Sequence, residues 1–337
     1  MGFSTLELCA GAGGQAIGLE RAGFECAAAV EIDPHACATL RANRPAWNVL
    51  EADLRSFDAR PYRGVDLVAG GVPCPPFSVA GKQLGDADER DLFAEALRVV
   101  EEALPTAVLL ENVPGFASAK FLGYRRRLLA RVHAMGYTAD FRVLNASGYG
   151  VPQLRPRFVL VALRERFAER FEWPQPAPCE TTVGRLLADL MGANNWPGCA
   201  RWVAKADGIG PTIVGGSKKH GGADLGPTRA KAKWLELGVD GKGVADEAPA
   251  ADFPVDALPR LTVRMVARLQ GFPNDWAFAG RKTAAYRQVG NAFPAPVPAA
   301  VAAMIARALD GTRSVPYRCE AGGQVYHFQR GRKSLTG

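Results

Sequence analysis

The sequence predicts an α/β protein in which a mostly parallel, Rossmann-like sheet carries helices on both faces and is followed by a smaller, loop-rich domain. Short apolar runs alternate with helical patterns over the first half of the chain, which is typical of βαβ units. A glycine-rich turn, residues 11–14, joins the first predicted strand to the first helix. After the proline-rich residues 174–178 the alternation stops, and glycine, proline and basic residues dominate residues 192–252.

Length, cysteine content and charge limit the kinds of protein that this chain can be. A chain of 337 residues is long enough for one large domain and a smaller one. Its seven cysteines form no CxxC pair and no Cys/His cluster, which argues against a disulfide framework and a metal site and predicts a reducing, cytoplasmic compartment. No signal sequence or membrane-length apolar run is present, so no membrane partner is expected. The net charge of +7 suits a polyanionic partner without identifying one.

The first predicted unit is a strand over residues 4–8, the glycine turn, and a helix over residues 15–21. Glycines let a ligand approach the backbone, and a helix N-terminus offers free amides to it. A second strand over residues 26–30 ends in Glu31, at the spacing of an acid that hydrogen-bonds ribose hydroxyls. The pattern predicts a nucleoside cofactor. The alternative is that Glu31 only precedes the next helix, residues 34–43.

Two further strand ends carry polar residues. A short apolar segment leads to Asp53, an acid that is expected to face an adenine amino group. A strand over residues 65–69 leads to the loop 70–78, in which prolines on both sides of Cys74 present its thiol on a stiff backbone. Stiffness suits a nucleophile. From this loop alone, however, a small buried cysteine is an equally good interpretation of Cys74.

The next helix, predicted over residues 91–103, is followed by a strand over 106–110 that ends at Glu111. We expect this carboxylate near Cys74 because parallel strands end at the same edge of a sheet. A helix over 125–135 and strands over 138–144 and 158–163 complete a sheet of six or seven strands.

An extended segment before the last of these strands carries Gln153, Arg155 and Arg157. Alternate residues of an extended segment share a face, so the two guanidiniums can hold a carboxylate and a carbonyl together. The alternative is a pair of ordinary surface arginines. In the loop-rich part, glycines around Lys218 and Lys219 let basic side chains approach phosphates, and a flexible loop is the alternative there. Helices are expected over residues 263–269 and 297–309.

These segments resemble, in the same order and over nearly the whole chain, the DNA (cytosine-5) methyltransferase family. The matching segments are residues 9–14 (the cofactor loop), 71–74 (the Pro-Cys motif), 111–113 (Glu-Asn-Val), 153–157 (Gln-x-Arg-x-Arg), 260–273 (the motif that organises the small domain) and 288–294 (the last motif). The resemblance implies that this chain methylates DNA with S-adenosyl-L-methionine.

The resemblance also implies a mechanism. Cys74 would add to carbon 6 of a cytosine and so activate carbon 5 for the methyl group. Protonated Glu111 would donate to ring nitrogen N3, Arg157 would hold the carbonyl oxygen, and Arg155 would orient Glu111 or the loop. The cytosine would have to be flipped out of the duplex. The base that removes the carbon 5 proton is not identifiable from the sequence, and a water is plausible.

The family pattern assigns further residues to each ligand. The residues expected to bind the cofactor are Cys9, Ala10, Gly11, Gly13, Gly14, Glu31, Ile32, Asp53, Leu54, Pro73, Leu92, Asn291 and Ala292. The residues expected to contact double-stranded DNA are Ser78, Thr212, Lys218, Lys219 and Arg229. No metal is expected, and the chain is expected to act as a monomer.

The same pattern divides the chain into residues 1–173, a catalytic and cofactor-binding domain; 174–282, a target-recognition domain; 283–315, a segment that returns to the catalytic domain; and 316–337, a basic tail. Three positions depart from the pattern. Pro75 replaces a usual Gln, Cys9 a usual Phe, and Met265 a usual Glu.

Three alternatives stay open at this point. The first is an RNA cytosine-5 methyltransferase acting on tRNA, and the second is a DNA-binding module that has lost catalysis. The third, a nicotinamide-dependent oxidoreductase, explains the glycine turn and Glu31 but none of the later motifs. The sequence gives neither the recognition site nor whether methylation serves a restriction–modification system.

Overall fold

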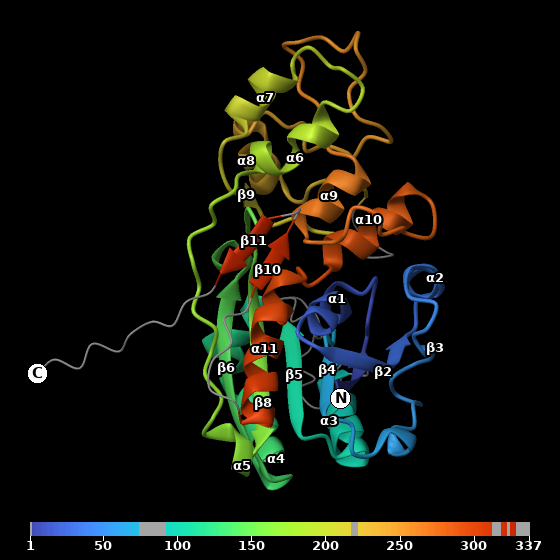
Figure 1. Cartoon of the computed structure of the whole chain (residues 1–337), viewed down its shortest axis with the longest axis vertical. Helices are drawn as coiled ribbons and strands as arrows, with labels where there is room; N and C mark the ends of the chain where they lie inside the picture. The colour runs from blue at the N-terminus through green and yellow to red at the C-terminus, as the bar shows by residue number, and fades with distance from the viewer. Residues whose placement is uncertain (1, 74–91, 217–221, 312–317, 322–323, 328–337) are drawn as a thin grey trace, which may run out of the picture.

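The computed structural model describes residues 2–73, 92–216, 222–311, 318–321 and 324–327. Figure 1 shows a lobe built on a β-sheet and, above it in that view, a smaller lobe of helices and loops. The catalytic cysteine candidate, Cys74, lies outside the described residues, as do Ser78, Lys218 and Lys219. The structure therefore bears on the surroundings of these four residues, and their roles stay predictions.

The sheet is the centre of the larger lobe. Its strands are β1 (Phe3–Leu8), β2 (Phe24–Glu31), β3 (Val49–Glu51), β4 (Leu67–Gly70), β5 (Ala107–Asn112), β6 (Tyr137–Asn145) and β8 (Pro156–Arg164). Their spatial order is β3-β2-β1-β4-β5-β8-β6. The first five strands in that order are parallel, and β8 is antiparallel to both of its neighbours. The predicted mostly parallel α/β sheet is confirmed.

Helices cover both faces of the sheet (Figure 1). Because neighbouring residues of a strand point to opposite faces, the apolar residues of β4 divide between two cores. The helices of this lobe are α1 (Gly14–Arg21), α2 (Pro34–Asn43), α3 (Leu92–Ala103), α4 (Leu122–Ala134), α5 (Glu165–Ala168) and α11 (Pro296–Asp310). Leu67 and Ala69 of β4 pack with Val297 in the core that includes α1 and α11, whereas Val68 packs with Phe93 in the core that includes α3 and α4.

The smaller lobe contains more helix than the sequence predicted. Its helices are α6 (Val183–Met191), α7 (Cys199–Lys205), α8 (Thr228–Glu236) and α9 (Val263–Leu269), and α10 (Lys282–Asn291) leads back toward the sheet. Residues 192–252 were expected to be loops, yet α7 and α8 lie within them. Each of these helices buries one tryptophan, Trp202 or Trp234, and such burial stabilises short helices.

The remaining elements are short. They are the 3-10 turns η1 (Arg60–Tyr62), η2 (Pro114–Ala117), η3 (Ala119–Phe121) and η4 (Ala146–Tyr149), and the strands β7 (Gln153–Leu154), β9 (Gly210–Pro211), β10 (Arg318–Ala321) and β11 (Gln324–His327). Within the described part of the chain, no single helix has the length and apolar character to span a bilayer. Only α10 and α11 taken together, with a bend between them, meet that test of length and composition.

Met265, one of the departures from the family pattern, has a defined structural role. Its backbone N–H donates to the Thr262 hydroxyl at 3.2 Å, and its sulfur accepts from the Thr262 N–H at 3.4 Å. This is the capping-box arrangement, in which the third residue of a helix usually supplies a carboxylate. The Met265 side chain is also buried in the core. Loss of the usual glutamate has therefore left the start of α9 intact.

Candidate active site and cofactor pocket

A cavity of about 440 Å³ opens at the carboxyl ends of β1, β2, β4 and β5. This is the edge at which open α/β sheets commonly bind ligands. Of the predicted cofactor residues, those that line the cavity are Cys9, Ala10, Gly11, Gly14, Glu31, Ile32, Asp53, Leu54, Pro73, Leu92, Asn291 and Ala292. Gly13 does not line it. The structure thus brings together residues that are up to 283 positions apart in the sequence.

Gly13 and Gly14 shape the turn that borders the cavity. Gly13 caps α1 with a φ of 90°, a conformation that L side chains rarely adopt. A Cβ on Gly14 would lie 2.6 Å from the carbonyl oxygen of Phe293. Because Gly14 has no side chain, α1 can pack closely against the last motif. Cys9, where the family usually has Phe, also has a positive φ of 51°. Burial raises the pKa of its thiol to about 12, so Cys9 is a neutral side chain in this wall.

Glu31 ties the glycine turn to the end of β2. One carboxylate oxygen accepts the N–H of Gly11 at 2.7 Å, and the other accepts the N–H groups of Ile32 and Asp33 at 2.8 Å each. Next to it, the Ile32 side chain is 60% exposed although it is large and apolar. A carboxylate beside an exposed apolar face is a chemical match to the ribose and base of a nucleoside.

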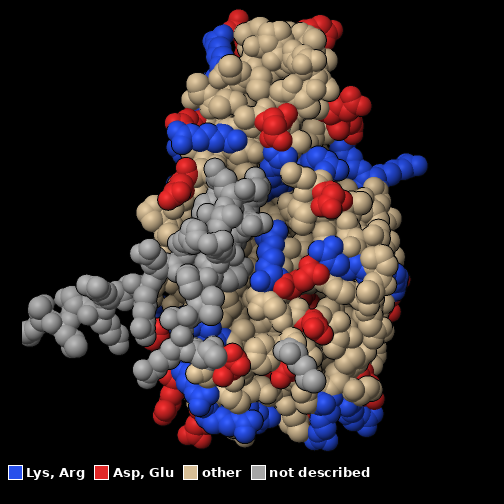
Figure 2. All heavy atoms as spheres, in the orientation of Figure 1, with Lys and Arg blue, Asp and Glu red and all other residues tan. Residues whose placement is uncertain are grey.

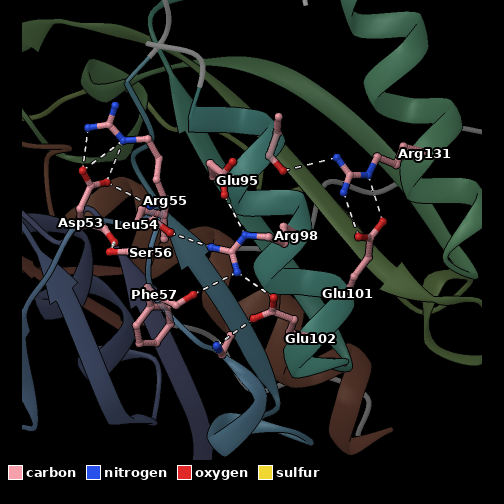
Figure 3. A network of polar contacts seen from close by, with 12 residues as sticks. Asp53, Leu54, Arg55, Ser56, Phe57, Glu95, Arg98, Glu101, Glu102 and Arg131 are labelled. Atoms are coloured by element: carbon pink, nitrogen blue, oxygen red, sulfur yellow. Dashed lines mark hydrogen bonds and ion pairs between the residues drawn. The ribbon is translucent and has the colours of Figure 1, made fainter. Parts of the chain in front are cut away.

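A network of charged residues fixes the loop that carries Asp53 and Leu54 (Figure 3). Arg98 of α3 donates to the carbonyl oxygens of Leu54 at 2.7 Å and Phe57 at 3.0 Å. The same guanidinium pairs with two glutamates of its own helix. Asp53 pairs with Arg55 at 2.6 Å, and this contact lowers the pKa of its carboxyl group. The part of the cavity wall formed by Asp53 and Leu54 is therefore anchored to α3.

Glu111, which lines the cavity, forms an ion pair with Arg157. Nε of Arg157 lies 2.7 Å from Oε1 of Glu111, and both side chains are almost buried. The contact exists because β5 and β8 are hydrogen-bonded neighbours. Antiparallel pairing with β8 also extends β5 through Glu111 and Asn112, beyond the strand end predicted at residue 110. Burial raises the pKa of Glu111, and the charge of Arg157 opposes that rise.

Asn112 links this pair to the loop that leads to Cys74. Its side-chain amide donates to the carbonyl oxygen of Val72 at 2.9 Å, and Asn112 is itself buried. Gly71, on the same loop, is so close to the pair that a Cβ there would lie 3.3 Å from Oε2 of Glu111. The described beginning of the loop is therefore held against the strand that carries Glu111.

Arg155 has different partners from those predicted. Its guanidinium donates to the backbone carbonyl oxygens of Ile213, Gly290 and Ala292, the last two at 2.8 Å. Among the described residues, no carboxylate hydrogen-bonds Arg155, although Glu111 is near enough to interact with its charge. Gln153 adds contacts to the Ile213 N–H and to Gln270. The Gln-x-Arg-x-Arg motif therefore joins the sheet to the smaller lobe and to the last motif, and only Arg157 pairs with Glu111.

Two of the predicted DNA contacts lie in the described part of the chain. The hydroxyl of Thr212 donates to the carbonyl oxygen of Leu154, so Thr212 holds its segment of the smaller lobe next to Arg155. Arg229 is exposed on α8. On the face drawn in Figure 2, Lys and Arg side chains gather near the junction of the two lobes. The described residues contain no group of three His, Cys, Asp or Glu side chains that could hold a metal ion.

Sequence reasoning missed several residues that line the cavity. They include Glu7, Gln15, Gly71, Arg287, Gln288 and Phe293. Glu7 was detectable, because a charged residue inside a predicted buried strand is unusual. Gln15 gave no signal of its own. Its place in the cavity wall becomes visible only once α1 is placed over the carboxyl end of β1.

Comparison with known proteins gives the same family as the motifs. The model of the C-5 cytosine-specific DNA methylase family matches residues 3–307. The Type II methyltransferase M.NaeI of Lentzea aerocolonigenes is 55% identical over 91% of this chain and 76% of its own length. The Type II methyltransferase M.NgoMIV of Neisseria gonorrhoeae is 50% identical over 92% of this chain and 99% of its own.

Solved structures show the same fold at lower identity. A DNMT2 variant from Spodoptera frugiperda has a TM-score of 0.65 at 19% identity and covers 90% of this chain and 99% of its own. The Entamoeba histolytica methyltransferase EhMeth has a TM-score of 0.65 at 14% identity, with coverage of 92% and 99%. Family membership rules out the nicotinamide-dependent alternative. The chain belongs to the C-5 cytosine-specific DNA methylase family and is a DNA (cytosine-5) methyltransferase.

Proposed function

We propose that this enzyme transfers the methyl group of S-adenosyl-L-methionine to carbon 5 of a cytosine that is flipped out of a specific double-stranded DNA sequence, through a covalent adduct of Cys74 at carbon 6. The observation that carries this proposal is the Glu111–Arg157 pair, held beside both the cofactor cavity and the loop that leads to Cys74. The proposed reaction needs Cys74, Glu111 and Arg157 within reach of one cytosine ring.

The cavity residues fit S-adenosyl-L-methionine. Glu31 keeps lone pairs for ribose hydroxyls after accepting its backbone bonds, and Ile32 offers an apolar face to adenine. The cofactor, when bound, supplies an electrophilic methyl group. The adjacent glycine turn leaves room for a ligand against the backbone, because nothing lies within 4 Å of the Cβ position of Gly11.

The catalytic roles of Glu111 and Arg157 follow from the negative charge that develops on the cytosine ring. Addition of a thiolate at carbon 6 puts negative charge on the ring, and a proton from Glu111 to N3 would neutralise it. Arg157 would hold the ring carbonyl while it positions Glu111. The raised pKa of Glu111 suits this role because the carboxyl group must be protonated to donate.

The description of the matching family, C-5 cytosine-specific DNA methylase, supports DNA as the acceptor. The two relatives are called Type II methyltransferases, and they align with this chain over at least 91% of its length. We therefore place sequence-specific DNA methylation, with cytosine flipping, ahead of methylation of RNA. The exposed basic side chains near the lobe junction would position the phosphates (Figure 2).

A duplex that carries 5-fluorocytosine at the target position tests the adduct directly. The normal reaction ends when a base removes the carbon 5 proton and the thiolate leaves. Fluorine cannot leave as a cation, so we expect a stable complex of protein, methyl group and DNA that survives denaturing electrophoresis. Peptide mapping should place the link at Cys74. Full turnover of the fluorinated duplex, with no trapped protein, would contradict the covalent route.

Replacement of Glu31 by alanine is expected to weaken S-adenosyl-L-methionine binding by about ten- to hundredfold, since it removes a charged partner of the ribose and the anchor of Gly11. Affinity for duplex DNA should change less than threefold. Separate titrations of the two ligands by calorimetry measure both effects. An equal loss for both ligands would indicate a folding defect instead of a cofactor contact.

Replacement of Glu111 by glutamine is expected to slow methyl transfer by about 10²- to 10⁴-fold, because an amide cannot deliver a proton to N3. The protonated form of Glu111 is present below its raised pKa and is lost as pH rises through that pKa. The wild-type single-turnover rate should therefore decline with pH in that range, and this decline should be absent from Glu111→Gln.

The matched control is Glu101→Gln, an exposed glutamate paired with Arg131 on the outer surface. It should keep the wild-type rate and pH profile. A Glu111→Gln enzyme of normal rate would remove Glu111 from the mechanism.

A further inference from the structure

Tyr286 of α10 joins two segments of the smaller lobe through one hydroxyl group. The side chain is fully buried, and its hydroxyl donates to the carbonyl oxygen of Val214 at 3.2 Å and to that of Asp224. Burial raises the pKa of this hydroxyl, so it keeps its proton and acts as the donor. One side chain of the last motif therefore holds the chain at residues 214 and 224.

Tyr286 is directed at the smaller lobe and not at the cofactor. The next two residues of α10, Arg287 and Gln288, line the cofactor cavity, whereas Tyr286 does not. Tyr286 instead belongs to the core that contains Ile213 and Leu225, the neighbours in sequence of Thr212 and Asp224. Its contacts therefore bear on the lobe in which DNA contacts are predicted.

Asp224 continues the link from Tyr286 to α8. One of its carboxylate oxygens accepts the N–H of Gly226 at 2.9 Å, two residues before the helix begins. The other oxygen accepts from Nζ of Lys231, on the helix itself, at 3.0 Å. The beginning of α8 is therefore tied to Tyr286 through a single residue.

The same helix lies close to the segments that border the active site. A Cβ on Gly210 of β9 would lie 2.5 Å from the Trp234 ring, so α8 packs directly on β9. Figure 1 shows α8 next to β9, which pairs with β7, the strand that leads to Arg155. A side chain at the start of α8 is therefore well placed to meet a duplex that enters between the lobes.

Arg229 is the basic side chain of α8 that is available to a ligand. Lys231 pairs with Asp224 at 3.0 Å, and Lys233 pairs with Glu236 at 2.8 Å. Arg229 is exposed and forms no ion pair with another described residue. A guanidinium binds phosphate through parallel N–H groups, so its direction of approach matters. The orientation of α8 therefore decides whether Arg229 can reach a phosphate.

We propose that Tyr286 is a positioning residue for DNA, which holds Asp224, and through it the start of α8, in the orientation at which Arg229 contacts a phosphate. This inference rests on the proposed function and deepens it. The same hydroxyl holds Val214, two residues after Thr212, so one side chain sets both predicted DNA contacts of the described smaller lobe. The last motif then serves the cofactor with one face of α10 and DNA with the other.

Tyr286→Phe removes the hydroxyl and keeps the ring. The probe is a short fluorescent duplex taken from a plasmid site that the wild-type protein methylates. Its affinity should fall about three- to tenfold, and the slope of log affinity against log salt should shrink by about one, as for one lost phosphate contact. KM for the duplex should rise while kcat changes less than about twofold, because Tyr286 does not line the cavity.

Arg229→Gln tests the route by which Tyr286 acts. Alone, it should weaken the duplex and reduce the salt slope as Tyr286→Phe does. In the Arg229→Gln background, Tyr286→Phe should cost less than about twofold in affinity, because the contact that it sets is already absent. Additive losses, or a normal affinity of the Arg229→Gln protein, would break the link between the two residues and overturn the proposal.

Asp224→Ala gives a result whose sign is diagnostic, and it keeps the proposal testable if Tyr286→Phe fails to fold. Removal of an acid should by charge alone tighten DNA binding. Loss of the contacts to Gly226 and Lys231 should instead weaken it and lower the salt slope, and this is the result that we expect. Tighter binding or unchanged binding by Asp224→Ala would overturn the proposal.

Tyr137→Phe is the matched control. Tyr137 is also buried, and its hydroxyl donates to the carbonyl oxygen of Pro105 at 2.6 Å, in the larger lobe. Both Tyr→Phe variants should lower the Tm to a similar extent, but only Tyr286→Phe should weaken the duplex. Wild-type DNA affinity of Tyr286→Phe would end the positioning role and leave the proposed function standing. If the wild-type protein methylated no plasmid DNA, the proposed function would fail, and this role with it.

Discussion

A Cys74→Ser enzyme is expected to lose at least about 10⁴-fold in methyl transfer while its affinity for duplex DNA stays within about threefold. A serine hydroxyl is a far weaker nucleophile than a thiolate, and cytosine carbon 5 does not react without prior addition at carbon 6. The phosphate contacts that dominate DNA affinity do not involve the thiol. Labelled methyl transfer in single-turnover conditions and an electrophoretic shift assay measure the two quantities.

Cys179→Ser provides the comparison for this variant. Cys179 is a half-buried cysteine whose thiol contacts the carbonyl oxygen of Thr181, and it does not line the cofactor cavity. Its replacement should leave methyl transfer at the wild-type rate. Normal methylation by Cys74→Ser would end the assignment of Cys74 as the nucleophile, whatever the effect on DNA binding.

Replacement of Arg155 by methionine is expected to lower the free energy of unfolding by about 3–5 kcal/mol. Arg155 is 1% exposed, and its removal leaves the carbonyl oxygens of Ile213, Gly290 and Ala292 without their donor. Burial lowers the pKa of Arg155 because its charged form loses contact with water. Denaturant titration measures the loss.

The structure predicts a second effect of Arg155→Met, on ligand binding. Ala292 lines the cofactor cavity, and Ile213 follows Thr212 in the smaller lobe. Loss of Arg155 should therefore weaken cofactor binding in addition to stability. Arg185→Met is the control, since Arg185 and its partner Asp207 are both more than half exposed, and it should change stability by less than about 1 kcal/mol. Equal stability of the two variants would contradict the role assigned to Arg155.

The sheet was predictable because its strands follow local patterns, and the family resemblance supplied most of the residues that were expected at the cavity. An apolar run marks a strand, and the polar residue that ends it, such as Glu31, lies at the carboxyl edge of the sheet by topology alone. The same reasoning placed Asp53 and Glu111 at that edge. Glu111 lies at this edge and pairs with Arg157 of β8, although β5 extends beyond the end predicted at residue 110.

Contacts between distant segments were not predictable in this way. Arg155 meets Ile213 and Gly290 across sequence separations of 58 and 135 residues, so nothing near Arg155 distinguishes it from Arg157. Likewise, α7 and α8 are stabilised by burial of Trp202 and Trp234 against the rest of the smaller lobe. A sequence pattern records neither the partner nor the burial. The backbone partners of Arg155 were therefore not predicted, although the family resemblance had given Arg155 and Arg157 different roles.

The most direct test of cytosine-5 methylation of DNA is methylation of plasmid DNA by the purified protein with labelled S-adenosyl-L-methionine, followed by bisulfite sequencing. We expect methyl groups on cytosine at a single repeated sequence, and no label in tRNA supplied in competition. Label in tRNA with none in the plasmid, or a plasmid in which every cytosine is still converted, would contradict it.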